Sequence, residues 1–345
     1  MTPAHANGFH MVFPGQVSSI LVYVGLDLVG DGLIKLPFVR SLRDAYPQAR
    51  ITWLAGKGKS TFNGVLKNVV DGLIDEVIER TDIGVSWSEV LRNPLPGRSF
   101  DLIIDTQKGA LASFALRRIR HRAIITPFAN FAFSSRRPPS GYKFPKNLQR
   151  QLLDLLEIAS GKKHPTPTGL IVPIARGLRD LAAELLPTGP TYIGLAPGAG
   201  GAQKCWPLEK FIELAKLQQA AGRVPVFILG PAEAGWDFKI RAEVPFAQFP
   251  LQDNEIGVRN GFAPELTIAL ANRMAACIAN DSGTGHMCAI SGTAMVSLFG
   301  RTTPDKFMPM ASRIAIVKAQ DYGGREMALI PVDAVALAVD GILAA

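Results

Sequence analysis

Short apolar runs alternate with longer amphipathic stretches along most of this 345-residue chain. In the first half, the apolar runs at 20–24, 50–54 and 100–105 predict strands, and residues 32–46 predict a helix. Strands that alternate with helices build parallel sheets with helices packed on them. We therefore expect an α/β fold.

The second half repeats this alternation. A helix is expected over 208–221, and an apolar helical run over 332–343 follows near the end of the chain. The repetition predicts two Rossmann-like units, each with a parallel sheet. The expected strands of the second unit lie at 191–196, 224–229, 275–280 and 293–299.

Chain length and breaker residues divide the sequence into two domains. A chain of 345 residues is too long for one ordinary core. Prolines and glycines cluster between residues 165 and 190, which predicts the connection. Two domains imply a central cleft between their sheets. We expect an N-terminal domain over 1–165, a linker over 166–190, a C-terminal domain over 191–325 and a C-terminal helix over 326–345.

Composition indicates a globular, cytoplasmic protein. Hydrophobic residues make up 48% of the chain and charged residues 19%, which is enough apolar material for two cores. No apolar run reaches the roughly 20 residues that a membrane span needs, and residues 1–15 lack a secretory signal pattern. Cys205, Cys277 and Cys288 show no metal-ligand spacing and are expected to be reduced thiols.

Positive charge is concentrated in the first half. Residues 1–165 hold 22 Lys and Arg against 13 Asp and Glu, whereas the remainder holds 15 against 16. Such a surface attracts nucleic acid, an anionic membrane or an anionic substrate, or is simply a solvated face. The excess centres on residues 106–153, which contain no acidic residue and carry Lys108, Arg117, Arg118, Arg120, Arg122, Arg136, Arg137, Lys143, Lys146 and Arg150.

The turn after the first expected strand offers an acidic residue where ligands bind. Open α/β sheets bind ligands at the carboxyl ends of their strands, and Gly30-Asp31-Gly32 lies there. The turn lacks the G-x-G-x-x-G spacing of dinucleotide-binding enzymes, which disfavours a nicotinamide dehydrogenase. Asp31 is either a general base or the N-cap of the following helix.

Two loops of the second half suit a diphosphate. Residues 196–207 carry flexible glycines and Lys204, but not the spacing of an ATP-hydrolysing P-loop. Residues 281–286 open a helix with small and hydroxyl side chains, and free N–H groups at a helix N-terminus bind phosphate. Both loops follow strands, so both are expected at one edge of the sheet.

Three further side chains of this half are candidates for the same site. Asp281 could accept hydrogen bonds from sugar or ribose hydroxyls. Glu233 follows the strand at 224–229 and is either a ribose ligand or a solvated loop acid. His286 either supports the site or is an ordinary core histidine.

Taken in order, these motifs resemble glycosyltransferase family 9, the ADP-heptose:lipopolysaccharide heptosyltransferases. Gly30-Asp31, with Pro37 six residues after the aspartate, is similar to the N-terminal signature of that family. Two further segments match in the same order: Pro197-Gly198-Ala199 with Lys204, Trp206 and Pro207 is similar to its P-G-A…K-x-W-P segment, and Asn280-Asp281-Ser282-Gly283-Thr284-Gly285-His286 to its D-[ST]-G-x-x-H turn.

The resemblance implies a GT-B fold that binds an ADP-sugar in the C-terminal domain and an anionic acceptor in the N-terminal domain. It implies transfer of heptose to a lipopolysaccharide core with inversion, and no required metal or cofactor. Asp31 would deprotonate the acceptor and Lys204 would stabilise the departing diphosphate. The implied donor-binding residues are Pro197, Gly198, Ala199, Lys204, Glu233, Asp281, Ser282, Gly283, Thr284 and His286, and the implied acceptor-binding residues are Gly30, Arg117, Arg118, Arg120, Arg136, Arg137 and Lys143.

The chain also departs from the family pattern. Gly25-Leu26-Asp27 stands where members usually have a basic, hydroxyl-rich stretch, and residues 130–142 match no family loop. Both departures fall in the half that would bind the acceptor, so its identity stays open.

Other readings remain. A nucleotide-sugar 2-epimerase shares the fold but needs no anionic acceptor, and a catalytically silent nucleotide-sugar-binding protein would not need Asp31. A lipid-linked acceptor would make the basic surface a salt-sensitive contact with the inner face of the inner membrane. Nucleic-acid binding is not expected, because no known module accompanies the aromatic residues among the arginines, Phe128, Phe131, Phe133, Tyr142 and Phe144.

Overall fold

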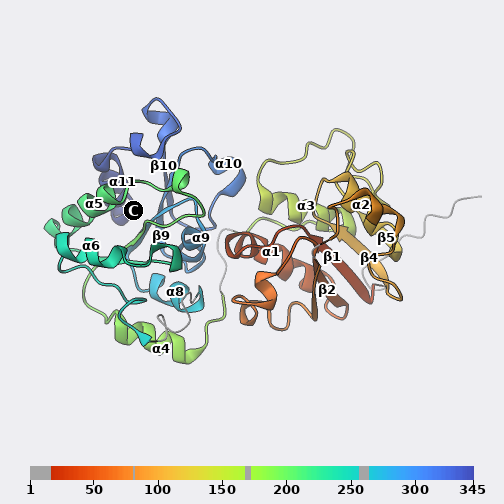
Figure 1. The fold of residues 1–345 in the computed structure, drawn as a ribbon, viewed down its shortest axis with the longest axis horizontal. Coiled ribbons are helices and arrows are strands. Elements are labelled where there is room, and N and C mark those ends of the chain that lie inside the picture. The colour runs from red at the N-terminus through yellow and green to blue at the C-terminus, as the bar shows by residue number, and fades with distance from the viewer. Residues whose placement is uncertain (1–16, 81, 168–171, 256–263) are drawn as a thin grey trace, which may run out of the picture.

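The computed structural model describes residues 17–80, 82–167, 172–255 and 264–345. It shows two lobes, one from each half of the chain (Figure 1). Each lobe is built on a sheet of five strands, and all paired strands in both sheets are parallel. The predicted α/β fold with two Rossmann-like domains is confirmed.

The N-terminal sheet has the strand order β3-β2-β1-β4-β5. The direction in which strands are added reverses between β1 and β4, where Ile20 lies opposite Leu102. Open α/β sheets bind ligands outside the carboxyl ends of the strands at such a reversal. The strands are β1 (Ser19–Val24), β2 (Arg50–Ala55), β3 (Glu76–Glu79), β4 (Ser99–Asp105) and β5 (Arg120–Ile125).

The C-terminal sheet has the order β10-β9-β8-β6-β7. Its reversal lies between β6 and β8, where Ile193 is opposite Ala276. The loops that follow β6 and β8 are therefore the expected ligand loops of this domain. The strands are β6 (Tyr192–Ala196), β7 (Val224–Phe227), β8 (Ala276–Asn280), β9 (Ala294–Phe299) and β10 (Ile314–Lys318).

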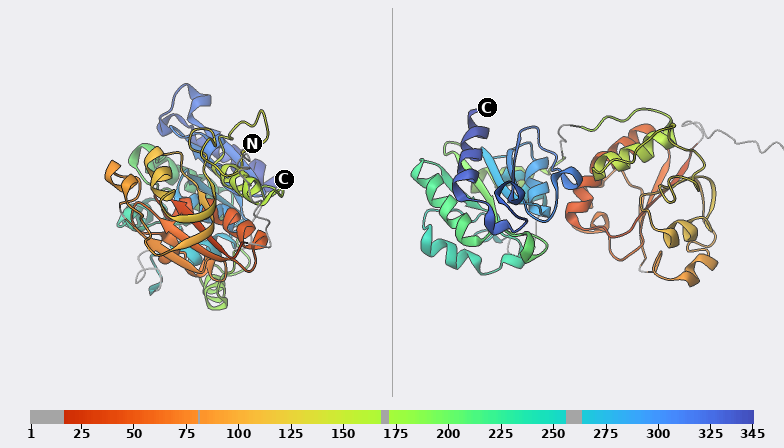
Figure 2. Two further views of the ribbon diagram at one scale, coloured as in Figure 1. Left: turned by 90° about the vertical axis from the view of Figure 1, so that its right-hand side faces the viewer. Right: turned by 90° about the horizontal axis from the view of Figure 1, so that it is seen from above.

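Helices cover both faces of the N-terminal sheet because successive strand residues point to opposite faces. Ile20 and Val22 of β1 face the core beneath α1 (Val29–Ala45) and α3 (Leu148–Ser160). Leu21 and Tyr23 face the core beneath α2 (Ala110–Leu116). The 3₁₀ helix η4 (Trp87–Leu91) contacts α2. Seen from above, α3 lies on the opposite side of the lobe from the orange and gold segments (Figure 2).

The C-terminal sheet is covered in the same way. One core lies beneath α5 (Leu208–Ala220), α6 (Trp236–Glu243) and α11 (Val332–Ala344), and contains Phe211, Ile240 and Val335. The expected C-terminal helix thus docks on this domain. The other core lies beneath α4 (Arg176–Leu185), α8 (Pro264–Ala271) and α9 (Gly283–Ile290). Shorter elements are η2 (Thr61–Asn63), η3 (Asn68–Val70), η5 (Ala202–Lys204), η6 (Pro231–Glu233), α10 (Pro304–Phe307), η7 (Ala319–Tyr322) and η8 (Met327–Leu329).

Two predicted boundaries change. The helix expected to begin at Gly32 begins at Val29. Part of the linker predicted over 166–190 forms α4, whose buried Ala182 packs in the same core as Leu266 of α8. An amphipathic helix buries its apolar side wherever a core accepts it, so α4 belongs to the C-terminal domain. The described part of the connection therefore ends near residue 175.

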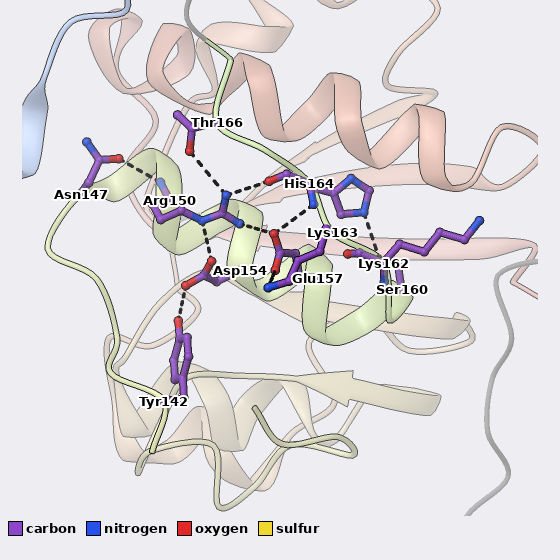
Figure 3. Close-up of polar contacts among 10 residues, drawn as sticks. All are labelled: Tyr142, Asn147, Arg150, Asp154, Glu157, Ser160, Lys162, Lys163, His164 and Thr166. Atoms are coloured by element: carbon purple, nitrogen blue, oxygen red, sulfur yellow. Dashed lines mark hydrogen bonds and ion pairs between the residues drawn. The ribbon is translucent and has the colours of Figure 1, made fainter. Parts of the chain in front are cut away.

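The chain that leaves the N-terminal domain is fastened to α3 (Figure 3). The Arg150 guanidinium donates a hydrogen bond to the His164 carbonyl oxygen at 2.7 Å and forms ion pairs with Asp154 and Glu157. Glu157 in turn accepts a hydrogen bond from the His164 backbone N–H at 3.0 Å. One arginine thus connects the helix to the start of the interdomain segment.

In the ranges that the structure describes, no helix is both long and apolar enough to cross a membrane.

Candidate active site

The two domains meet through the loops that the sequence singled out. A Cβ atom added at Gly30 would lie 3.3 Å from the Cα of Gly283 and 3.5 Å from Cδ2 of His286. A side chain at position 30 would be tight against Gly283, and the neighbouring backbone would have to move by a few tenths of an ångström. Helix α1 of the N-terminal lobe and helix α9 of the C-terminal lobe face each other at the centre of the molecule (Figure 1). The segment of the predicted acceptor motif and that of the predicted donor motif are thus in contact.

Asp31 lies in the first turn of α1, one residue after this contact. It is not the N-cap of the helix, because Leu28 holds that position and no side chain caps α1. The half-buried Asp31 carboxylate has no hydrogen-bond or ion-pair partner within the described ranges. Of the two readings of this residue, the helix cap is wrong, and the general base stays a prediction.

The loop that leads into α1 is held by Asp27, which in the sequence is only a departure from the family pattern. The Asp27 carboxylate accepts hydrogen bonds from Lys35 Nζ at 2.6 Å, Ser60 Oγ at 2.5 Å and Trp53 Nε1 at 3.0 Å. All four side chains are buried. Lys35 interrupts an apolar run in α1, and a lysine in such a run is the one sequence signal that could have indicated a buried partner.

Asn280 joins the two loops of the C-terminal domain. Its side-chain Nδ2 donates to the Pro197 carbonyl oxygen at 2.7 Å, and its Oδ1 accepts from the Trp206 backbone N–H at 3.0 Å. Asn280 is the last residue of β8 and is buried. It therefore sets the loop after β6 against the turn that begins at Asp281. Asn280 belongs to the motif at 280–286, but no local pattern indicated this role.

Gly198 and Glu233 lie against each other. A Cβ atom at Gly198 would be 2.4 Å from Cδ of Glu233, so a larger residue at position 198 would displace the carboxylate. Glu233 is buried and accepts a hydrogen bond from the Gly230 backbone N–H at 2.8 Å. The reading of Glu233 as a solvated loop acid is wrong. Its carboxylate faces the backbone at Gly198, in the loop expected to bind the donor.

Lys204 and Asp281 form an ion pair at the same place. Lys204 Nζ lies 3.2 Å from Asp281 Oδ2, with the Asp281 side chain almost fully shielded and Lys204 about one-third exposed. The ammonium also lies 5.8 Å from the centroid of the Phe307 ring. A buried carboxylate holds the lysine at the mouth of the site, where its charge is accessible to an anionic ligand.

Helix α9 begins beside this ion pair. Ser282 is its N-cap, and the Ser282 Oγ accepts a hydrogen bond from the Gly285 backbone N–H at 3.1 Å. Gly283 and Thr284, the first two residues of the helix, are half-buried. The positive end of the helix dipole and the Lys204 ammonium therefore point to one region, which favours a diphosphate there.

His286 is buried one turn into α9. Burial lowers the pKa of its imidazole to about 4; the nearby Asp281 carboxylate opposes this shift and the Lys204 ammonium supports it. The ring is therefore neutral at pH 7. It lines a hollow between the domains together with Leu33 and Met308. His286 is thus a buried histidine at the domain contact.

The predicted acceptor arginines of α2 and β5 lie elsewhere. Arg120 is the first residue of β5, so it lies at the amino-terminal edge of a parallel sheet whose carboxyl edge carries Asp31. Arg118 donates to the Val90 carbonyl oxygen at 2.8 Å, and Arg117 donates to the Phe133 carbonyl oxygen at 3.0 Å. Helix α2 returns the chain to the far edge of the sheet. The structure does not bring these three residues to Asp31.

Arg136 and Arg137 form a separate group. Arg136 donates to the Ala159 carbonyl oxygen at 3.1 Å, near the end of α3, a helix about 20 Å long. Both arginines line a cavity of about 360 Å³ beside that helix end, and Lys143 is exposed in the preceding loop. The opposite end of α3 meets the C-terminal domain, where Gln149 contacts Met310. This group too is removed from Asp31.

Residues 90–327, more than half of the chain, match the model of the family described as glycosyltransferase family 9 (heptosyltransferase). The chain belongs to glycosyltransferase family 9. The matched segment of this family 9 protein contains the loops of Lys204, Glu233 and Asp281, and it begins after Asp31.

The family 9 protein is similar to named relatives over most of its length. It is 23% identical to the lipopolysaccharide core heptosyltransferase OpsX of Haemophilus influenzae, covering 84% of this chain and 81% of that protein. A family 9 glycosyltransferase structure from Veillonella parvula matches with a TM-score of 0.70 and 21% identity, covering 95% and 97% of the two chains. The heptosyltransferase WaaC of E. coli with ADP matches with a TM-score of 0.64 and 17% identity, covering 94% and 99%.

These structural neighbours confirm the GT-B fold of the family 9 chain. Family membership makes it a glycosyltransferase. In the part of the chain that the structure describes, no three His, Cys, Asp or Glu side chains are grouped so that they could hold a metal ion.

Proposed function

We propose that this family 9 enzyme transfers a heptose, or a related sugar, from an ADP-sugar to a hydroxyl of an anionic lipopolysaccharide core or a related glycan. The observation that carries the proposal is the contact between Gly30 and Gly283, which brings the segment of Asp31 against the segment that begins at Asp281, the partner of Lys204. A base for an acceptor and a cradle for a diphosphate are then within one site. OpsX is named for heptose transfer to a lipopolysaccharide core, and WaaC has been solved with ADP and with an ADP-2-deoxy-2-fluoro heptose.

The reaction follows from these positions. Asp31 accepts the proton of the acceptor hydroxyl as its oxygen forms a bond to the anomeric carbon. The bond from that carbon to the diphosphate oxygen breaks on the opposite face, which inverts the configuration, and the bonding electrons leave with ADP. The Lys204 ammonium and the N-terminus of α9 stabilise the charge on the leaving diphosphate. This scheme requires neither a metal ion nor a cofactor.

The donor contacts come from the C-terminal domain. Glu233, held behind Gly198, accepts hydrogen bonds from the ribose hydroxyls, and Asp281 accepts one from the sugar once Lys204 turns to the diphosphate. Pro197 and Ala199 flank the backbone that faces the nucleotide. Asn280 keeps the two loops in register and is a positioning residue. We place the reaction in the cytoplasm, at the inner face of the inner membrane.

The test is release of ADP from ADP-heptose by purified protein, with and without a deacylated lipopolysaccharide core acceptor. We expect release that depends on the acceptor and is lost in Asp31→Asn. Isomerisation of the sugar without an acceptor would instead support an epimerase. Binding of ADP-heptose without turnover, whichever acceptor is added, would support a catalytically silent binding protein.

A further inference from the structure

Three large apolar side chains protrude from the N-terminal domain around η4. Val85, Trp87 and Leu91 are 61%, 70% and 79% exposed, and they lie within seven residues of one another. Neither the proposed transfer reaction nor the folded core uses them. Large apolar side chains grouped on a surface mark a site of interaction.

The segment that carries these side chains is held in place. The Glu89 carboxylate accepts hydrogen bonds from the backbone N–H groups of Gly84 at 2.7 Å and Val85 at 3.2 Å. Arg118 donates to the Val90 carbonyl oxygen at 2.8 Å, which fixes η4 against the end of α2. Glu89 thereby turns its charge toward the backbone. The apolar side chains are displayed by an ordered turn.

Two cations lie beside this apolar group. Arg92 follows it directly, and Arg118 reaches it from the end of α2. Arg117 and Arg120 are the near sequence neighbours of Arg118, and all four arginines are exposed. Asp82, another acidic residue of this segment, forms an ion pair with Arg80, with 3.9 Å between Asp82 Oδ1 and Arg80 Nε. We call the set of Val85, Trp87, Leu91, Arg92, Arg117, Arg118 and Arg120 the η4 patch.

We propose that the η4 patch docks the N-terminal domain on an anionic lipid bilayer. Tryptophan favours the boundary between headgroups and acyl chains, where its ring is apolar and its N–H stays wet. Arginine pairs with phosphate groups, and an anionic leaflet attracts each cation near its surface. Valine and leucine have no stacking face for nucleic-acid bases, so the apolar part of the patch fits acyl chains.

The proposal assigns a purpose to Arg117, Arg118 and Arg120 that differs from acceptor binding. This docking surface rests on the proposed function in one respect: a lipid-linked acceptor would place the enzyme at a membrane. Membrane binding needs apolar insertion and charge attraction together, since either alone is weak and reversible. The η4 patch supplies both from one turn and one helix end.

The experiment measures sedimentation of the purified full chain with vesicles of equimolar phosphatidylglycerol and phosphatidylcholine, at low and at high salt. We expect binding at low salt that falls at high salt and is weak on pure phosphatidylcholine. Trp87→Ser with Leu91→Ser should lower the partition coefficient by about tenfold or more. Arg92→Ser should lower it by about fivefold.

A matched control is Phe238→Ser, since Phe238 is 78% exposed on α6 of the C-terminal domain. It should leave vesicle binding unchanged. Equal binding by the Trp87/Leu91 variant and the wild type would overturn the proposal. A second result would also overturn it. If the wild type and the Phe238 variant self-associate with increasing concentration and the Trp87/Leu91 variant does not, the patch binds a second copy of the chain.

Activity on a water-soluble, deacylated acceptor separates this proposal from the transfer reaction. The Trp87/Leu91 variant should keep wild-type turnover and thermal stability while it loses vesicle binding. If the wild type shows no transfer but still binds anionic vesicles through η4, the proposed function fails and the docking surface stands. If transfer is intact and vesicle binding is absent, the docking surface fails alone.

Discussion

The Lys35 ammonium lies 2.6 Å from an Asp27 carboxylate oxygen, and both side chains are almost wholly shielded from water. Asp27 precedes Asp31 by four residues, and Lys35 follows it by four. The pair therefore spans the β1–α1 loop and the first turn of α1, where the free carboxylate lies. Charge inside the N-terminal domain thus holds the backbone on both sides of Asp31.

Breaking this pair should destabilise the protein strongly. Removal of one partner leaves a buried charge without compensation, so Lys35→Met should lower the free energy of unfolding by about 3–5 kcal/mol. Adding Asp27→Asn should restore about half of the loss or more, because no buried charge then remains. Urea unfolding of the single and double variants measures both effects. The exposed pair Lys216–Glu243 is the control, with an expected effect below about 1 kcal/mol. Equal losses in the single and double variants would contradict the buried-charge argument.

Asp31→Asn should lower kcat by about 10²–10⁴-fold, because the amide cannot accept the proton of the acceptor. Stability and ADP affinity should be unchanged, since the Asp31 side chain has no partner within the described ranges. ADP release under saturating acceptor measures the effect. Asp44→Asn, at an exposed position later in α1, is the matched control and should keep full activity. A full-rate Asp31→Asn enzyme would show that another group takes the proton.

Lys204→Met should weaken ADP binding by about tenfold to a hundredfold, because a charge-assisted contact to the diphosphate is lost. Isothermal titration calorimetry with ADP, in the absence of acceptor, measures it. Lys216→Met, on the exposed side of α5, should bind ADP as the wild type does. Unchanged affinity in Lys204→Met would place the diphosphate away from the Lys204–Asp281 pair.

His286 should make the protein less stable in mild acid. Burial lowers its pKa in the folded state to about 4, below the ordinary value of 6.5. Between these values the unfolded chain binds a proton that the folded chain does not. The contribution of the neutral His286 ring to the free energy of unfolding is complete above pH 6.5. It is lost as the pH falls toward 4, by up to about 3 kcal/mol. The free energy of unfolding of His286→Gln, measured across this range, should fall less steeply than that of the wild type.

Asp105 should affect the pH dependence of stability in the direction opposite to His286. Burial raises the pKa of Asp105 to about 6 from the ordinary value of 3.8, against hydrogen bonds from Ser113 and Thr126 that favour the charged form. The folded chain therefore holds a proton between these values that the unfolded chain has lost, so this contribution shrinks as the pH rises from about 4 to 6. Asp105→Asn should make stability rise more steeply with pH in that window. An unchanged slope would show that Asp105 is charged throughout.

Arg150→Met should loosen the start of the interdomain segment. It removes the hydrogen bond to His164 and two ion pairs, at an expected cost of about 1.5–3 kcal/mol. Limited trypsin digestion should then cleave faster after Lys162 and Lys163. Arg176→Met, which removes only an exposed ion pair at 3.6 Å, should not change the cleavage rate. Equal rates in both variants would show that the network does not restrain this segment.

Local sequence features were enough to predict the two units and the loops of the site. Alternating apolar runs indicate strands within a few residues, and a loop that follows a strand lies at the carboxyl edge of a parallel sheet whatever the strand order. That is why Asp31, Gly198 and Asp281 could be placed at ligand-binding edges in advance. The strand orders that bring the β1 and β4 ends together, and likewise the β6 and β8 ends, come from the structure.

The acceptor arginines show where local reasoning stops. Charge counts identified a basic stretch, yet α2 carries Arg117 and Arg118 away from the edge where Asp31 lies. Three further contacts join segments that no local pattern relates: Trp53 with Asp27, the His164 carbonyl oxygen with Arg150, and Gly198 with Glu233.

The sequence by itself determined the fold class, the family resemblance and the short motifs, because each depends on residues that are close together in the chain. The tertiary structure alone decided that Gly30 meets Gly283, that Lys35 neutralises Asp27, and that the arginines beside η4 lie apart from Asp31. These relationships depend on how strands are ordered and how two domains meet. Both are settled by burial and close packing over the whole chain, and not by the periodicity of any one segment.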